Sequence, residues 1–293
     1  MTDGFLLVDK PGGMTSHDVV DAARRALGVR KVGHAGTLDP MATGLLVLGV
    51  GRCTRLLRFV QTAPKTYVGR VVLGVATDTL DADGGIVDRA PMEVTEDEFA
   101  AAAARFVGTI MQAPPMVSAV KMGGRRLYEL AREGVDVERA ERPVEIFSID
   151  VIDFAPSEYP EAVIRVRCGT GTYVRTLADD IARALGGRAH LGALRRLAIG
   201  SLGVGEAASL DDLRRSAPGS LLLPAAEGLR DLPALRAAGD TAAGVGHGTA
   251  FSAALLGADE GASGPHRVLD EVGDLLAVYR VEGKAAVPEV VVS

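Results

Sequence analysis

GHAGTLDPMATG, residues 33–44, places one carboxylate in a loop that holds three glycines and a proline, directly before the apolar run 45–50. Glycine tolerates positive φ and the close approach of another backbone, so this loop can turn tightly. Pro40 fixes its own φ and favours an extended conformation at Asp39. Two interpretations follow: Asp39 is part of an Asp-Pro turn before a buried strand, or it is a nucleophile or base on a rigid scaffold. This fragment alone leaves both open.

Five further segments decide between these interpretations, because together with residues 33–44 they occur in the order found in one enzyme family. They are LVDKPGGMTS (7–16), KTY (65–67), SAVK (118–121), GTGTYVR (169–175) and HLGALRRL (190–197). The chain therefore resembles the TruB family, the tRNA pseudouridine-55 synthases, over about residues 5–200. One short motif could arise by chance, whereas six in order are hard to explain otherwise.

The resemblance implies an α+β pseudouridine synthase fold with a long mixed, mostly antiparallel sheet. It also implies a catalytic domain over residues 1–232, with an RNA-clasping thumb inserted at about 118–143. After about Pro233, glycine and alanine dominate and short valine-rich segments appear, which favours a small β-rich domain over residues 233–293. In this family a PUA-like domain often lies at that place.

The periodicity of apolar residues predicts the elements around the motifs. Strands are expected at 5–9, 45–50, 67–73, 144–154 and 162–168, and helices at about 16–27, 52–60, 95–107 and 174–185. Thr15 or Ser16 is expected to cap the first helix, and Gly28 to end it. The acidic segment 78–85 fits no calcium-loop register and is interpreted as a polar turn.

The composition is that of a globular protein. A chain of 293 residues suggests one large or two modest domains, and 47% hydrophobic residues supply a buried core. We expect neither a membrane span nor a signal peptide, because the apolar runs are short and the N-terminus has no basic segment before an apolar one. Cys53 and Cys168 stand far apart without a CxxC pattern, as expected of core residues or free thiols in a reducing compartment. A cytoplasmic protein is therefore expected.

The net charge of −6 conceals an uneven distribution. Residues 1–70 hold ten basic and five acidic side chains, and residues 165–200 hold seven basic and two acidic ones. Residues 224–293 hold five basic and ten acidic side chains. Because a polyanion responds to the local field, the two basic segments, which also carry most motifs, favour a nucleic-acid partner. The alternative is that these charges form ordinary solvated faces.

Pseudouridine formation, the reaction that the resemblance implies, breaks the N1–C1′ bond of uridine and joins C5 to C1′. Neither formula nor redox state changes, so no cofactor is expected, and the sequence has neither a dinucleotide fingerprint nor a Walker A motif. Asp39 would be the catalytic carboxylate. It would stabilise a cationic sugar, attack it or take a proton from it, and the sequence does not distinguish these roles.

All three roles require Asp39 to be ionised in a partly dry pocket, which a fixed guanidinium would favour. The resemblance makes Arg175 the catalytic partner, although an isolated arginine is more often a structural charge. One local departure precedes it, because Gly169-Thr170 stands where the family more usually has Ser-Lys or Ser-Ser. The loss of a possible lysine there could weaken a phosphate contact.

Five more residues match family positions at the substrate. Tyr67 would stack on the flipped uracil and take part in proton transfer, and Tyr173 is a second stacking candidate, because only 12 of 293 residues are aromatic. His34 would fill the space that the flipped base leaves, Leu194 would line the uracil pocket, and Lys10 would bind phosphate or pack locally. Judged singly, Tyr67 and Leu194 would be core residues and His34 a structural one. No second His or Cys stands near His34 at metal-site spacing, so no metal is expected.

The expected partner is the T-arm of tRNA, bound by a monomer that needs no guide RNA, protein partner or membrane. The main alternative is a tRNA-folding chaperone that binds without catalysis. A glycosidase would need a second catalytic carboxylate in a comparable loop, and the sequence shows none.

Overall fold

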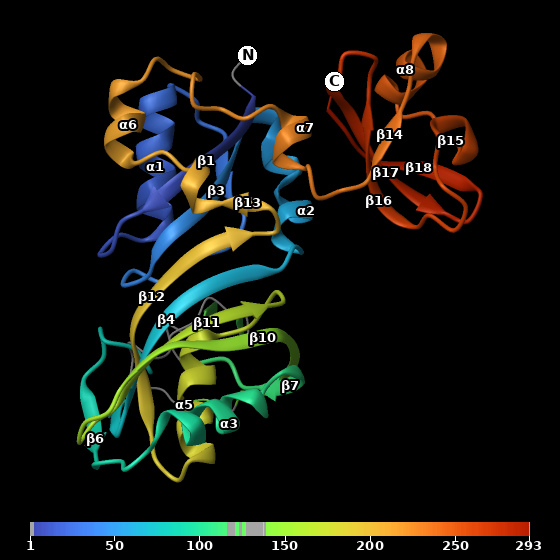
Figure 1. The fold of residues 1–293 in the computed structure, drawn as a ribbon. Coiled ribbons are helices and arrows are strands. Elements are labelled where there is room, and N and C mark those ends of the chain that lie inside the picture. Colours follow the sequence, from blue (N-terminus) through green and yellow to red (C-terminus); the bar gives the residue numbers. More distant parts are fainter. Residues whose placement is uncertain (1–2, 116–120, 123–124, 127–136, 138, 293) are drawn as a thin grey trace. The chain divides into compact units, whose positions relative to one another are not determined.

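The computed structural model describes residues 3–115, 121–122, 125–126, 137 and 139–292 (Figure 1). These residues form two compact units, which are described separately. The first contains residues 1–39, 44–63 and 199–293, and the second contains residues 40–43 and 64–198. Among the described residues, no helix has the length and apolar character needed to cross a membrane.

The first unit is built on strand β1 (Gly4–Lys10), which pairs antiparallel with β3 (Thr43–Val50) along its whole length. Strand β2 (Val32–His34) also pairs with β3. Helix α1 (Ser16–Leu27) begins at a capping box formed by Thr15 and ends at Gly28, whose φ is 65°. The sequence predicted both ends of this helix.

Both faces of β1 are buried, because successive side chains of a strand point to opposite sides. Leu6 and Val8 pack in one apolar cluster with the inner face of α1, and Phe5 and Leu7 pack in another. The outer edge of β1 is also covered, because the backbone of Phe5 exchanges hydrogen bonds of 3.0 and 2.7 Å with Leu223.

The C-terminal part of the first unit is a five-stranded sheet in the order β14-β16-β17-β18-β15. Its strands are Ala234–Arg236 (β14), Phe251–Ser252 (β15), Gly264–Leu269 (β16), Leu275–Glu282 (β17) and Ala285–Val291 (β18), and helix α8 spans Gly239–Gly246. Leu269, Leu275, Val278 and Val290 share an apolar cluster with Phe5. The β-rich character expected here is confirmed, and the domain boundary between residues 232 and 233 stays a prediction.

Shorter elements complete this unit. They are the 3-10 helices Gly51–Arg55, Val204–Glu206 and Ala254–Leu256, the helices α2 (Leu57–Gln61), α6 (Leu210–Arg215) and α7 (Ala225–Gly228), and strand β13 (Leu202–Gly203). The helix expected at 52–60 is thus a 3-10 turn followed by α2. Arg58 on α2 forms a 3.1 Å ion pair with Glu289 on β18.

The second unit holds a sheet in the order β12-β4-β11-β10-β7. Its strands are Lys65–Leu73 (β4), Gly108–Gln112 (β7), Arg142–Ala155 (β10), Glu161–Cys168 (β11) and Ala189–Ile199 (β12). The pairs β4/β11, β11/β10 and β10/β7 are antiparallel. Helices α3 (Glu96–Ala104) and α5 (Val174–Ala184) pack against strands of this sheet and against each other. Helix α3 ends three residues before the predicted position, and β7 follows at Gly108.

A small hairpin of β5 (Val75–Thr77) and β6 (Ile86–Arg89) encloses the acidic segment 78–85. The thumb expected at about 118–143 lies mostly outside the described residues. In its described part, β8 (Lys121–Met122) pairs with β9 (Arg125–Arg126), and β10 begins at Arg142.

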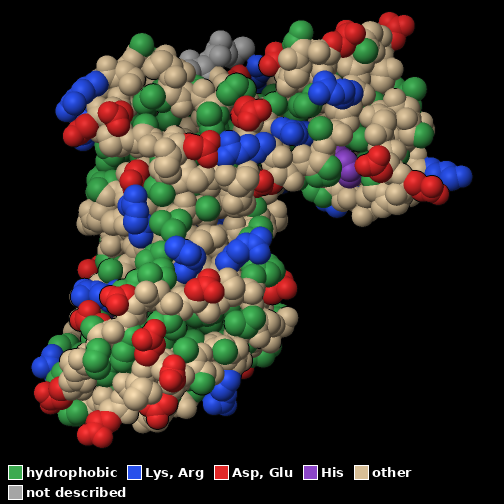
Figure 2. Space-filling view, in the orientation of Figure 1, with side chains coloured by type: hydrophobic (Ala, Val, Ile, Leu, Met, Phe, Trp, Pro, Cys, Tyr) green, Lys and Arg blue, Asp and Glu red, His purple; other side chains and the backbone are tan. Residues whose placement is uncertain are grey.

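Charges of both signs are interspersed on the face of the molecule drawn in Figure 2. Among the described side chains seen there, Lys and Arg lie between Asp and Glu and do not gather in one large basic patch. The predicted attraction of a polyanion to the basic segments therefore stays a prediction.

Candidate active site

The loop that carries Asp39 connects β2 to β3, and its residue Leu38 is anchored from α1. The Oγ atom of Ser16, which is 1% exposed, accepts a 2.8 Å hydrogen bond from the backbone N–H of Leu38 and donates one of 3.1 Å to its carbonyl. Gly36 and Gly44, on either side of Asp39, have φ of 112° and 100°. These values lie in the region that favours glycine, so the tight path of the loop requires them. Asp39 itself is half-buried.

His34 ends β2 and packs against a second histidine that the sequence analysis did not select. The rings of His17 and His34 meet edge to face, with centroids 5.7 Å apart and planes at 82°. His17 lies in the first turn of α1 and is exposed. Nothing in the spacing of these two residues predicts their contact, which depends on how α1 packs beside β2. Among the described residues, no group of three or more His, Cys, Asp or Glu could hold a metal ion.

Lys10 is completely buried at the end of β1. Its ammonium group donates hydrogen bonds of 2.9 Å to the carbonyl of Pro11 and 2.6 Å to that of Met14. These contacts close the KPGGM segment on itself. The geometry favours local packing, one of the two alternatives for this residue, and its predicted phosphate contact stays a prediction.

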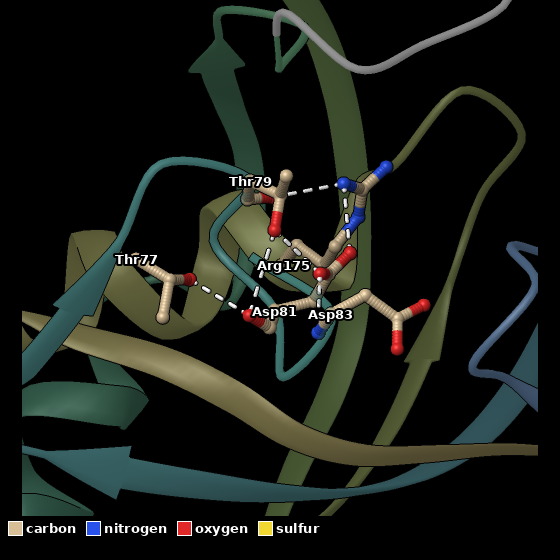
Figure 3. A network of polar contacts seen from close by, with 5 residues as sticks. All are labelled: Thr77, Thr79, Asp81, Asp83 and Arg175. Carbon is tan, nitrogen blue, oxygen red and sulfur yellow. Dashed lines mark hydrogen bonds and ion pairs between the residues drawn. The ribbon is translucent and has the colours of Figure 1, made fainter. Parts of the chain in front are cut away.

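Arg175, near the start of α5 in the second unit, is held by the acidic loop. Its Nη1 donates hydrogen bonds of 2.9 Å to the carbonyl of Thr79 and 3.1 Å to Oδ2 of Asp81 (Figure 3). Arg175 and Asp81 are 2% and 4% exposed. The pair is therefore removed from water, where ionic attraction is strong and the loss of either partner is costly.

Asp81 is fixed in turn by its own loop. Its Oδ1 accepts hydrogen bonds of 2.5 Å from the hydroxyl of Thr79 and 3.1 Å from the backbone N–H of Asp83, and its carbonyl accepts one of 2.8 Å from Thr77 (Figure 3). The segment is a turn, as expected, but it is not merely polar and exposed. Asp81 was not among the predicted site residues. The predicted partnership between Arg175 and Asp39, which belong to different units, stays a prediction.

Tyr67 and Leu194 lie on adjacent strands of the second unit. Tyr67 is half-buried on β4, opposite Val166 of β11, and Leu194 is 8% exposed on β12. A Cβ atom added to Gly69 would lie 3.5 Å from a methyl carbon of Leu194. Because residues two apart on a strand share a face, Tyr67 and Leu194 lie on the same side of the sheet. The sheet thus brings together two of the residues expected at a uracil pocket.

The turn before α5 carries Thr170, the residue at the departure from the family pattern. Its hydroxyl accepts a 2.6 Å hydrogen bond from Nζ of Lys65, the first residue of β4. Burial, together with the positive charge of Arg196, lowers the pKa of Lys65 to about 8. A threonine at this position therefore supplies an acceptor for a buried ammonium group. Tyr173 follows as the half-buried N-cap residue of α5.

Both cysteines are buried and reduced. Burial is the largest cause that raises the pKa of each thiol, Cys53 and Cys168, to about 11. Neither thiol is activated as a nucleophile at neutral pH, so both serve as core residues, one of the two roles predicted for them.

Residues 24–174 match the family model described as TruB family pseudouridylate synthase (N terminal domain). The chain is 50% identical over 249 residues to tRNA pseudouridine synthase B of Symbiobacterium thermophilum, which covers 85% of this chain and 83% of the relative. It is 48% identical over 207 residues to tRNA pseudouridine synthase B of Dechloromonas aromatica, with coverage of 71% and 68%.

Two solved structures contain chains with a similar fold. A Cbf5-Nop10-Gar1 complex contains a chain that is similar with a TM-score of 0.74 and 25% identity, over 100% of this chain and 85% of that one. An H/ACA RNP bound to a substrate RNA containing 2′-deoxyuridine contains one with a TM-score of 0.75 and 24% identity, over 99% and 85%. These neighbours confirm the predicted pseudouridine synthase fold. On its sequence and its fold, the chain belongs to the TruB family of pseudouridylate synthases.

Proposed function

We propose that this protein is a tRNA pseudouridine synthase, an isomerase that converts a uridine of tRNA into pseudouridine. The observation that carries the proposal is the 50% identity over 85% of the chain to a relative named tRNA pseudouridine synthase B. The anchored Asp39 loop supports it, because the one motif carboxylate predicted to react is half-buried on a constrained backbone. The TruB motifs further support uridine 55 of the T loop as the target.

The reaction needs no external oxidant or reductant. The N1–C1′ bond breaks, C5 bonds to C1′, C5 loses its proton and N1 gains one, so atoms and electrons balance. Asp39 is the proposed catalytic carboxylate, which attacks C1′, stabilises a cationic sugar or takes the proton. Arg175 is the proposed partner that keeps Asp39 ionised. Asp81 supports this role of Arg175, because it fixes the guanidinium from a buried position.

The remaining side chains would hold the substrate. A uridine within a folded T loop has to leave the base stack before C1′ can react. Tyr67 would stack on the flipped uracil while Leu194 packs at the pocket, a proposal supported by their place on one face of the sheet. Tyr173 would offer a second aromatic surface. His34 would occupy the vacated space, backed by the ring of His17. Lys10 would organise its loop and thereby support the site indirectly.

The proposed enzyme acts as a monomer on the tRNA T-arm without a guide RNA or protein partner. The relatives named tRNA pseudouridine synthase B favour this over the assembled state of Cbf5, since their identity to this chain is about twice as high. Two buried, reduced cysteines are in keeping with a reducing compartment, and the proposal places the enzyme in the cytoplasm.

Tritium release from tRNA that contains 5-tritiated uridine tests the proposal. The wild-type protein should release tritium in proportion to pseudouridine formed at position 55, because C5 loses its hydrogen only when the new bond forms. The matched control is the same tRNA with cytidine at position 55. Tight binding of tRNA without any release would support the chaperone alternative and overturn the enzymatic one.

A further inference from the structure

Gln112, the last residue of β7, holds the backbone of Tyr173 with both ends of its amide group. Its Oε1 accepts a 2.7 Å hydrogen bond from the N–H of Tyr173, and its Nε2 donates one of 3.1 Å to the Tyr173 carbonyl. Gln112 is 3% exposed and lies 61 positions earlier in the chain. The paired contacts resemble those between two strands, and a buried amide that satisfies both of its ends in this way is well fixed.

The residue that Gln112 holds begins helix α5. Tyr173 is the N-cap residue, and its side chain makes no capping hydrogen bond. Its carbonyl also accepts the first helical hydrogen bond, 3.0 Å long, from the N–H of Leu177. Because Arg175 lies two positions further on, the orientation of the Tyr173 backbone also affects where the Arg175 side chain starts.

Side-chain packing contributes little at Gly171, in the turn before Tyr173. Gly171 is exposed, has φ of 86°, and would have no atom within 4 Å of an added Cβ. Thr170 beside it is exposed as well, and its hydroxyl is held by the hydrogen bond from Lys65. A turn with open space around it relies on hydrogen bonds at its ends, and the Gln112 amide supplies two of them.

We infer that Gln112 is a positioning residue of the tRNA isomerisation reaction, which fixes Tyr173 and the start of α5 through the Tyr173 backbone. This inference rests on the proposed function. Gln112 makes no substrate contact in it. A protein without the Gln112 amide would still fold and bind tRNA. Its Tyr173 and Arg175 side chains would lose the alignment that turnover needs.

Substitution of Gln112→Glu, which preserves the shape of the side chain, tests the inference through a pH profile. Above the pKa of the introduced carboxyl, its oxygen still accepts from the Tyr173 N–H, but a charged oxygen then faces the Tyr173 carbonyl. Protonation restores an O–H donor toward that carbonyl, and burial raises the pKa of such a carboxyl into an accessible range. The single-turnover rate constant at saturating enzyme should therefore fall about tenfold or more relative to wild type at pH 8. It should recover toward the wild-type value as the pH falls to about 6.

The matched control is Thr109→Glu, which adds a carboxyl to an exposed position on the same strand. Its rate relative to wild type should stay the same at both pH values. The Kd for tRNA of the Gln112→Glu protein, from filter binding, should stay within about twofold of wild type, since the predicted effect is on alignment.

Gln112→Met, which keeps the length without either hydrogen bond, guards against misfolding of the Glu variant. It should be slow at every pH. A wild-type rate at pH 8 in either variant would overturn the inference, and so would a loss in Gln112→Glu that lowering the pH does not reverse. If wild type itself releases no tritium, the proposed function fails, which is a different result.

Discussion

Loss of the Asp81 carboxylate should destabilise the second unit and slow turnover. Asp81→Ala removes a partner of a pair in which Arg175 is 2% and Asp81 4% exposed. Breaking a buried pair by removing one member costs about 3–5 kcal/mol. For a chain of this size about 1 kcal/mol shifts the melting temperature by roughly 2–4 °C, so a decrease of about 6–20 °C is expected. Differential scanning fluorimetry with a dye measures it.

Asp83→Asn is the matched control, since it removes a carboxylate from the same loop. The side chain of Asp83 is exposed and points away from Arg175 (Figure 3), and only its backbone N–H contacts Asp81. Its melting temperature should remain within about 2 °C of wild type, as for most surface substitutions. Asp81→Asn keeps an acceptor oxygen but no charge. Its melting temperature should lie between those of Asp81→Ala and Asp83→Asn. Equal melting temperatures for Asp81→Ala and Asp83→Asn would refute the argument that the buried ion pair stabilises this region.

Three further outcomes are expected. Asp39→Asn should bind tRNA with wild-type affinity yet lose several orders of magnitude in single-turnover rate, and a rate within about tenfold of wild type would remove Asp39 from the reaction. Ser16→Ala leaves the N–H and carbonyl of Leu38 without their buried hydroxyl partner, so stability measured by urea unfolding should fall by about 1–3 kcal/mol, unlike that of a variant at exposed Thr37. The logarithm of the association constant for tRNA should fall with the logarithm of the salt concentration, with a slope of about −0.7 to −0.9 per phosphate contacted. A flat plot would contradict the argument from the basic segments.

Local sequence predicted those parts of the fold that local physics determines. Thr15 and Gly28 bound α1 because a hydroxyl before a helix and a glycine after it satisfy backbone groups wherever the helix packs. The strand at 45–50 was predicted in the same local way, from its continuous run of apolar residues. Helix α3 was placed with less accuracy, since Arg105, Phe106 and Val107 after Ala104 include no helix-breaking residue, and the chain turns into β7 at Gly108.

The candidate site was predicted less completely, because its supporting contacts join distant parts of the chain. Three aspartates among glycines are typical of an exposed turn, and nothing local marks Asp81 as the one that meets Arg175 from 94 positions away. Ser16 was considered only as a helix cap, whereas its hydroxyl serves the Asp39 loop 22 positions on. The resemblance to the family's motifs selected residues that are expected to face the substrate. No motif marked the side chains that hold those residues in place, such as Asp81 and Ser16.

The core of the first unit has a consequence for the order of events during synthesis on the ribosome. Phe5 packs in the cluster that includes Val278 and Val290, and its backbone pairs with Leu223. The nascent strand β1 therefore cannot bury its apolar side chains fully until residue 290 has emerged. At about 5–20 residues per second, the interval between the synthesis of Phe5 and that of Val290, 285 positions later, lasts roughly 15–60 seconds. The edge of β1 stays uncovered until residue 223 has emerged, and its core stays incomplete for longer. In this condition, chaperone binding to a nascent chain protects most against wrong pairing.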